Sequence, residues 1–205
     1  MKKILIISML AMLAVLVTVG LAGCGCGVEE EEAILLVEDL VSRSHKLNVV
    51  YFEKGIQYEP SGNSNDVYLR ALVTEEFVLK SKLLEETRKV FSQSYAQSII
   101  DMAFGGVQSE INQNSIMSRY SVLLDDDWIY VNKDYVPLVN CLPEYDFSTI
   151  SIKKTSFRFI EATIEAVADF KVITEQGTVI ERKKTTIDVV LTYEDGEWRL
   201  DSATC

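Results

Sequence analysis

The strictest pattern in this chain is the alternation of apolar and polar residues over positions 158–172. Successive side chains of a β-strand point to opposite faces, so a period of two predicts a strand with one buried and one wet face. Such a strand is typical of an antiparallel sheet that is covered on one side only. Its predicted buried face consists of Ile160, Ala162, Ile164, Ala166, Ala168, Phe170 and Val172, and its outward residues are Glu161, Thr163, Glu165, Asp169 and Lys171.

Two more strands are predicted after this one. A turn at Glu175-Gln176-Gly177 leads into residues 179–193. Asp195-Gly196 is the strongest hairpin signal in the chain, because both residue types accept the positive φ of a two-residue turn. It leads into a closing strand. The inward residues expected in these two strands are Ile187, Val189, Leu191, Tyr193, Trp198 and Leu200.

Shorter strands are predicted in the middle of the chain. Residues 119–124 and 128–131 flank Asp125-Asp126-Asp127 and predict a hairpin. Residues 67–73 predict a short strand, and a further strand opens at Ile150. The segments between them are polar or rich in turn-forming residues, and the predicted loops are residues 55–66, 107–118 and 132–145.

Helical periodicity is confined to the first half of the chain. Apolar residues spaced by three and four from Ala33 predict an amphipathic helix that extends to about Leu47. A second helix is predicted over residues 81–91, and Ser92 is the expected N-cap of a third that stops at Gly105-Gly106. Because the helices precede the strands, the predicted class is α+β with an antiparallel sheet, in a single domain over residues 33–205.

The N-terminus carries an export signal. Lys2 and Lys3 precede an apolar run over residues 4–17, and Leu21-Ala22-Gly23-Cys24 resembles the lipobox of bacterial lipoproteins. The resemblance implies cleavage after residue 23, a diacylglycerol on the Cys24 sulfur and an acidic tether over residues 24–32. The protein is then expected on the extracytoplasmic face of the cell membrane. The alternative is an uncleaved signal anchor, because the apolar run approaches the length that spans a bilayer.

Charge restricts the partners of this protein. Loss of residues 1–23 leaves 18 Lys and Arg against 31 Asp and Glu, a net charge of −13. Such acidity argues against nucleic acid, because binding of phosphate backbones requires clustered basic residues. It also opposes adsorption to an anionic leaflet, so the acyl chains must supply the membrane anchor.

Three cysteines remain after Cys24. A disulfide between Cys141 and Cys205 would tie down the end of the last strand, and the alternative is that Cys26, Cys141 and Cys205 are unpaired thiols. A nucleophilic cysteine is disfavoured, because His45 is the single histidine and the chain offers no second imidazole to activate a thiol.

No constellation of residues indicates catalysis or a metal. His45, on the first predicted helix, can act as a base or be a boundary residue between core and solvent, and Arg158 can bind an anionic ligand or lie exposed at a strand end. Asp125-Asp126-Asp127 lacks the alternating spacing and glycine of a calcium loop, which favours a solvated hairpin tip. No G-x-S-x-G elbow is present. We therefore expect no catalytic residues, no metal and no cofactor.

Tyrosines near predicted loops suggest a binding surface. Tyrosine offers a large contact area at low entropy cost, so Tyr130 and Tyr135, next to the long 132–145 segment, are candidates together with Arg158. The alternative is that most of these aromatic residues cap the core.

Two resemblances refine these expectations. The order of helices followed by long strands ending in Asp195-Gly196-Glu197-Trp198-Arg199-Leu200-Asp201 resembles the cone-shaped nuclear-transport-factor-like and SnoaL-like superfamily, which implies a curved sheet. Phe91-Ser92-Gln93-Ser94-Tyr95-Ala96 and Arg119-Tyr120 with Trp128-Ile129-Tyr130-Val131 resemble Firmicute lipoproteins related to the DL-endopeptidase inhibitor family. That likeness implies a non-enzymatic binding protein directed at a cell-wall hydrolase or another envelope protein. The alternative is a cone that binds a small ligand, with isomerase-like or hydrolase-like chemistry.

Overall fold

The computed structural model describes residues 27–108, 116–135, 143–174 and 177–204. The predicted lipid-attachment residue Cys24 and the cysteines Cys26, Cys141 and Cys205 lie outside the described residues. Residues 136–142, half of the predicted loop at 132–145, also lie outside them. Among the described helices, none combines the length and the apolar character that crossing a bilayer requires.

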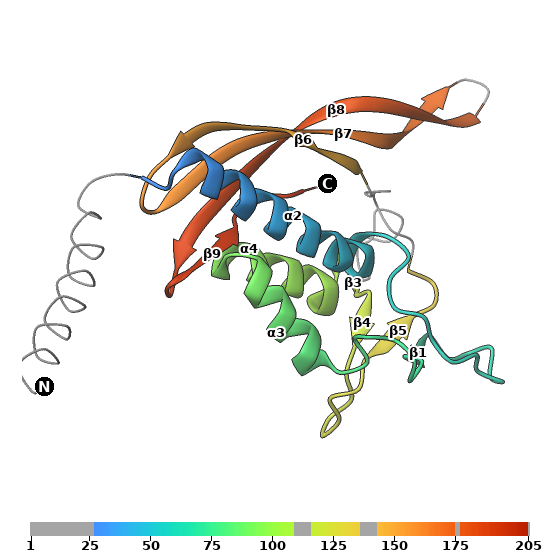
Figure 1. Ribbon diagram of the computed structural model, residues 1–205. Coiled ribbons are helices and arrows are strands. Elements are labelled where there is room, and N and C mark those ends of the chain that lie inside the picture. Colours follow the sequence, from blue (N-terminus) through green and yellow to red (C-terminus); the bar gives the residue numbers. More distant parts are fainter. Residues whose placement is uncertain (1–26, 109–115, 136–142, 175–176, 205) are drawn as a thin grey trace, which may run out of the picture.

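The predicted α+β class is confirmed. Three helices come early in the chain, and antiparallel strands dominate its second half (Figure 1). Helix α2 (Glu30–Phe52) is followed by α3 (Lys80–Val90), α4 (Gln93–Ile100) and a π-helical turn (Asp101–Gly105). Helix α3 matches its predicted range to within one residue at each end.

The large sheet contains the predicted alternating strand. Strands β6 (Glu144–Thr155), β7 (Phe159–Thr174), β8 (Gly177–Glu194) and β9 (Glu197–Leu200) pair antiparallel in sequence order. The buried face of β7 is confirmed from Ile160 to Ala166, since Ile160, Ala162, Ile164 and Ala166 are all buried. Ala168, predicted to share this face, is only half-buried. The register places Ile160 opposite Leu191 and Ala162 opposite Val189, which are buried too.

The predicted inward orientation of Tyr193, at the end of β8, is wrong. Tyr193, predicted to point inward, is 46% exposed. The tight turn at Asp195 and Gly196, with φ values of 53° and 88°, pairs Tyr193 with Trp198 across the strands. Their rings lie 5.2 Å apart between centroids, so the two aromatic side chains cover each other at the edge of the core. The predicted hairpin itself is confirmed.

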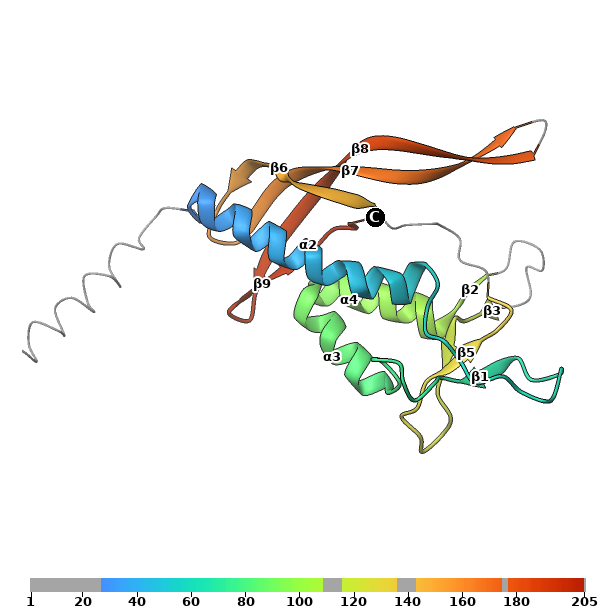
Figure 2. The ribbon, with the colours of Figure 1, turned by 45° about the vertical axis from the view of Figure 1, so that its right-hand side comes forward.

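Strands β7 and β8 extend beyond the helices. Strand β6 pairs with β7 only as far as the Glu144–Val167 pair, whereas β7 and β8 remain paired up to Thr174 and Gly177. The outer part is therefore a two-stranded ribbon, which projects from the body in Figure 2. Three exposed basic residues of β8 lie on this ribbon: Arg182, Lys183 and Lys184. Their charge opposes edge-to-edge pairing with another chain.

A small second sheet lies near the C-terminal end of α2. Its order is β1 (Tyr68–Arg70), β5 (Tyr130–Asn132) and β4 (Tyr120–Ser121), all antiparallel. The predicted hairpin around the three aspartates is thus confirmed, although its strands are shorter than expected. Prediction of a loop over residues 107–118 is wrong at both ends, because β2 (Val107–Gln108) pairs with β3 (Ile116–Met117). Strands of two residues are too short to show a period.

Helix α2 is longer than its apolar pattern. It begins three residues before Ala33, in the acidic run, because acidic residues in a first turn favour the positive end of the helix dipole. It continues beyond Leu47 because the polar residue Asn48 lies on its buried face and donates a hydrogen bond of 2.8 Å to the Thr204 hydroxyl. Because the polar Asn48 occupies a core position, it interrupts the apolar pattern, and the pattern therefore does not predict the last turns of this helix.

The main core is shared by the helices and the large sheet. In Figures 1 and 2, α2 runs along the sheet and α3 and α4 lie on the other side of α2. Val37 and Val41 of α2 are fully buried, as are Leu83 of α3 and Leu200 of β9. Ser92 caps α4 as predicted, since its Oγ accepts a hydrogen bond of 3.2 Å from the Tyr95 amide. Gly106, with a φ of 84°, follows the π-helical turn and confirms the predicted stop.

Candidate functional site

The three residues predicted for a binding surface do not form one site. Tyr130 and Tyr135 are half-buried. Tyr130 begins β5, and Tyr135 follows the end of this strand by three residues. Arg158 is exposed in the turn between β6 and β7, which lies beside the N-terminal end of α2, whereas β5 lies near its C-terminal end (Figures 1 and 2). Helix α2 has 23 residues and is roughly 34 Å long, so its length separates the two locations.

Arg119 and Tyr120 form a buried polar centre at the C-terminal end of α2. Arg119 is 4% exposed, and its guanidinium donates hydrogen bonds to the carbonyl oxygens of Tyr51, at 3.1 Å, and Glu53. Its Nε donates to the Tyr120 hydroxyl at 3.1 Å, and that hydroxyl donates to the carbonyl oxygen of Val50. The last carbonyl groups of a helix lack hydrogen-bond donors within the helix. Here the side chains of Arg119 and Tyr120 are the donors.

The tyrosines of this centre are held neutral. Burial raises the pKa of Tyr51, whose hydroxyl lies 2.7 Å from the Thr87 hydroxyl. Burial also raises the pKa of Tyr120, against the opposing effect of the Arg119 charge. Because Tyr51 and Tyr120 are buried and their hydroxyls are bonded within the core, we interpret this centre as structural. The Arg119 guanidinium carbon also lies 5.1 Å from the centre of the Tyr135 ring, which places Tyr135 over this core.

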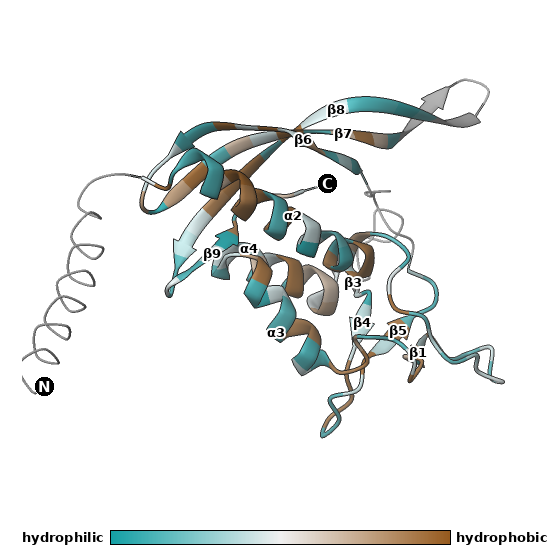
Figure 3. Cartoon of the chain, viewed as in Figure 1, coloured by the Kyte–Doolittle hydropathy of each residue, from teal (hydrophilic) through white to brown (hydrophobic). Residues whose placement is uncertain are grey.

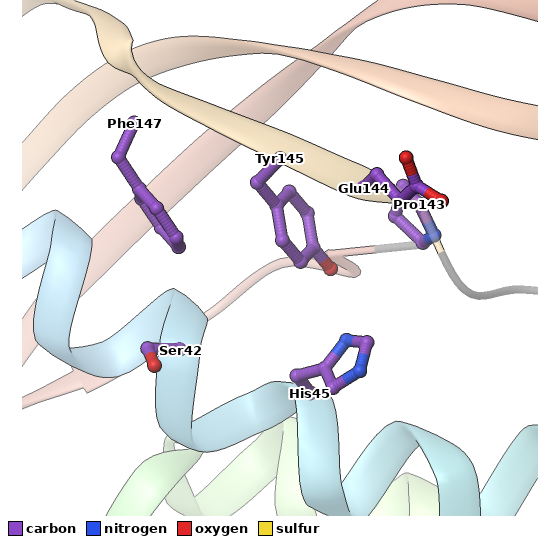
Figure 4. A pocket seen from close by; sticks show the side chains of 6 residues that line it. All are labelled: Ser42, His45, Pro143, Glu144, Tyr145 and Phe147. Carbon is purple, nitrogen blue, oxygen red and sulfur yellow. The ribbon is translucent and has the colours of Figure 1, made fainter.

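A cleft of about 460 Å³ lies between α2 and the start of β6. Figure 4 shows its lining: His45 and Ser42 come from α2 and face Tyr145 and Phe147 across the opening. The His45 and Tyr145 rings meet edge to face with centroids 6.2 Å apart. Pro143 and Glu144 complete the lining.

Two polar groups of this cleft, the Tyr145 hydroxyl and the Glu144 carboxylate, are already engaged. The Tyr145 hydroxyl donates a hydrogen bond to the carbonyl oxygen of Thr204. Glu144 forms an ion pair of 2.5 Å with Arg182 of β8, and its carboxylate points away from the imidazole in Figure 4. His45 therefore has no carboxylate oriented toward it from the described lining. The paired rings and the volume of the cleft can accommodate a small aromatic or apolar ligand.

The loop between β4 and β5 carries the most exposed large hydrophobic residue of the described chain. Leu124 is 97% exposed, and the adjacent Leu123 is exposed too. Asp125, Asp126 and Asp127 follow directly, and Figure 3 shows this change from hydrophobic to hydrophilic within one loop. We call residues 123–127 the leucine–aspartate tip.

The aspartates of this tip shape the loop. Asp125 adopts a positive φ of 68°, which aspartate tolerates at a turn. Asp126 accepts a hydrogen bond of 2.9 Å from the Trp128 amide, and Asp127 accepts one of 3.1 Å from the Ser81 amide at the start of α3. A carboxylate at a helix N-terminus is stabilising. Within the described ranges, no cluster of three or more acidic, histidine or cysteine side chains is arranged to hold a metal ion.

Sequence reasoning missed the leucines of this tip. It assigned residues 119–124 to a strand, whereas β4 ends at Ser121 and leaves Leu123 and Leu124 in the turn. A signal was present, because two adjacent leucines cannot both face the core from a strand with alternating sides. The cleft had no such signal, since His45 and Tyr145 are 100 positions apart in the sequence.

No protein-family profile matches this chain, and no curated protein matches it.

Proposed function

We propose that this protein is a lipid-anchored extracytoplasmic protein that binds and regulates another envelope protein and performs no chemistry itself. The observation that carries the proposal is the leucine–aspartate tip. Adjacent exposed leucines on a turn tied to the body through Asp127 support a protein-binding surface. The tip lies far from the N-terminal end of α2, where the membrane anchor would begin (Figure 1).

The partner we propose is a cell-wall hydrolase or another envelope protein with a basic groove. The tip would place Leu124 in an apolar pocket while Asp125 and Asp126, both exposed, face basic side chains at its rim. Charge complementarity of this kind mainly increases the association rate and is weakened by salt. The net charge of −13 after loss of residues 1–23 favours the same class of partner.

The membrane anchor we propose is a diacylglycerol on Cys24, exposed by cleavage after Gly23. The lipobox Leu21-Ala22-Gly23-Cys24 supports it. We also propose that the large sheet and the helices form a cone-like body similar to the nuclear-transport-factor-like superfamily, which the α+β class and the continuous pairing of β6 to β9 support.

The experiment is affinity capture from solubilised envelopes with the native acylated protein as bait. A Leu123→Ser and Leu124→Ser double variant removes the apolar part of the tip. Leu35→Ser is the matched control, because Leu35 is also an exposed leucine but lies in the first turns of α2. We expect the wild-type protein and the control to retain one envelope protein that the double variant loses by at least tenfold, with weaker retention at high salt.

Two results would contradict the proposal. Equal capture by the wild-type protein and the double variant would exclude the tip as the binding surface. An intact Met1 with an unmodified Cys24 thiol, found by mass spectrometry of the native protein, would exclude the anchor.

A second candidate function is the binding of a small ligand in the cleft. The face-to-edge contact of His45 with Tyr145 and the volume of about 460 Å³ favour it. The His45 proton resonances report on this site directly. A ligand in the cleft would shift them, and His45→Gln would abolish its binding without affecting capture of the envelope protein.

A further inference from the structure

The backbone of Gly27 lies against the turn that joins β6 to β7. A methyl group added at Gly27 would stand 3.0 Å from the Thr155 Oγ1 atom and 3.1 Å from the Ser156 Cα atom. Such distances are tighter than most real contacts, so only glycine fits here without displacement of the turn. The next residue, Val28, packs against the main core. The start of the described chain is thus fixed beside this turn, as Figures 1 and 2 both show for the N-terminal end of α2.

The same turn presents an aromatic ring to solvent. Phe157 is 71% exposed, although large aromatic side chains are usually covered. The turn is internally braced, because the Ser156 hydroxyl oxygen accepts hydrogen bonds from the amides of Arg158, at 3.1 Å, and Phe159, at 3.0 Å. The carbonyl oxygen of Arg158 accepts a further bond of 2.9 Å from the Tyr193 amide. Phe157 therefore points outward from a rigid support.

Basic side chains accompany this ring. The Arg158 guanidinium carbon lies 5.2 Å from the centre of the Phe157 ring, and the Lys154 ammonium lies 4.7 Å from the centre of the Phe159 ring. Lys153 is already paired with Asp188 at 2.7 Å. Glu161 stands opposite Lys154 in the register, and the acidic run of α2 begins nearby, so the surroundings are not basic as a whole. The turn therefore exposes an aromatic ring and basic side chains on a protein whose net charge is negative.

The chain length between this turn and the proposed anchor is short. Cys24 precedes Gly27 by three residues, which span at most about 11 Å in any conformation. An acylated Cys24 would therefore hold Phe157 within the depth of the lipid headgroups, where aromatic rings and snorkelling basic side chains are favoured.

We propose that the β6–β7 turn is a second membrane contact, in which Phe157 enters the headgroup region and Arg158 faces the lipid phosphates. The inference rests on the proposed lipid anchor at Cys24. Acyl chains alone hold the protein at the membrane but leave its tilt undefined. A rigid turn at the same end would fix the tilt, so that α2 points away from the bilayer.

The experiment uses the acylated full-length protein on vesicles that contain brominated lipids, which quench tryptophan fluorescence on contact. Phe157→Trp introduces the reporter at the turn. Leu124→Trp is the matched control, because residue 124 is more exposed but lies at the other end of the molecule. The native residues Trp128 and Trp198 are present in both variants and are subtracted with the wild-type signal.

We expect brominated lipids to quench the added tryptophan at position 157 at least threefold more than the one at 124. Vesicles of phosphatidylcholine alone and vesicles that include phosphatidylglycerol should both give this result. Quenching only with phosphatidylglycerol would assign the contact to the basic side chains and overturn the insertion of the ring.

The failures of the two proposals are distinguishable. Vesicles that sediment with the protein but leave position 157 unquenched overturn the turn contact and leave the anchor intact. Protein that does not sediment with vesicles at all overturns the anchor, and the turn contact with it.

Discussion

The Nη1 atom of Arg119 donates a hydrogen bond of 3.1 Å to the carbonyl oxygen of Tyr51, a residue 68 positions earlier in the chain. Through this contact a side chain just before β4 completes the end of α2. The small sheet and the long helix are thereby joined by a buried cation rather than by apolar packing alone.

Replacement of Arg119 by Met should destabilise the protein strongly. The change leaves the carbonyl oxygens of Tyr51 and Glu53 without these donors in a buried site, and the expected loss is about 3 kcal/mol in the free energy of unfolding. Urea denaturation measures it. Arg43→Met is the control, because the ion pair of Arg43 with Asp39 is exposed and should contribute about 0.5 kcal/mol. Similar losses in both variants would contradict the assigned role of Arg119.

Gly55→Ala should disrupt the same centre from the other side. Gly55 has a φ of 70°, and a methyl group there would overlap the Arg119 Nη2 atom. Left-handed backbone strain and this overlap together should cost about 2–3 kcal/mol. Gly62→Ala, where nothing lies within 4 Å of the added methyl group, should change the melting temperature little. A stable Gly55→Ala protein would show that Arg119 moves freely.

Stability should decline at high pH because of the buried tyrosines. The pKa values of Tyr51 and Tyr120 are raised by burial, so above the unfolded pKa of about 10 the unfolded chain loses protons that the folded chain retains. Their contribution is complete below that pH and is lost as the pH rises toward the folded pKa values. Urea denaturation between pH 8 and pH 11 should show this fall. Tyr51→Phe should make the slope shallower, whereas the exposed control Tyr58→Phe should not.

Thr204 should contribute to stability through its hydroxyl. That oxygen lies 2.9 Å from the Ser44 hydroxyl and accepts a hydrogen bond of 2.8 Å from Asn48. Thr204→Val keeps the shape but removes the acceptor of the Asn48 amide, at an expected cost of about 1–3 kcal/mol. The Ser44 hydroxyl keeps its bond to the carbonyl oxygen of Val41. The exposed Thr186→Val on β8 is the matched control for a thermal melt. Equal melting temperatures would assign no role to this contact.

The Cys141–Cys205 disulfide stays a prediction. Thr204, which precedes Cys205, accepts a hydrogen bond from Tyr145, four residues after Cys141. We expect peptide mapping without reductant to recover one cross-linked pair of peptides, and reduction to lower the stability by about 3–4 kcal/mol. Alkylation of both thiols in the unreduced, denatured protein would exclude the bond.

Local patterns predicted those parts of the fold whose physical cause is local. The alternation after Ile160, the turn at Asp195-Gly196 and the cap at Ser92 depend on neighbouring residues, and all three are confirmed. The pairing of β2 with β3 and the burial of Asn48 depend on contacts that no window of sequence contains.

The candidate sites follow the same division. The adjacent leucines at 123 and 124 could have been recognised from the sequence, because they violate the strand period. The cleft at His45 and the position of Gly27 against Ser156 could not, since each joins residues more than 90 positions apart. The sequence leaves Arg158 either an anion site or an exposed residue at a strand end, and the structure shows it exposed. The exposure of its neighbour Phe157 emerges only from the turn geometry.

The brief connection between Cys24 and Gly27 has a consequence for what the protein can reach. A lipoprotein on a long flexible linker samples a wide shell of the cell wall, but a body seated directly on its acyl chains does not. With α2 perpendicular to the membrane, the leucine–aspartate tip would stay at one nearly constant distance from the bilayer surface. Only partners located at that distance would contact it.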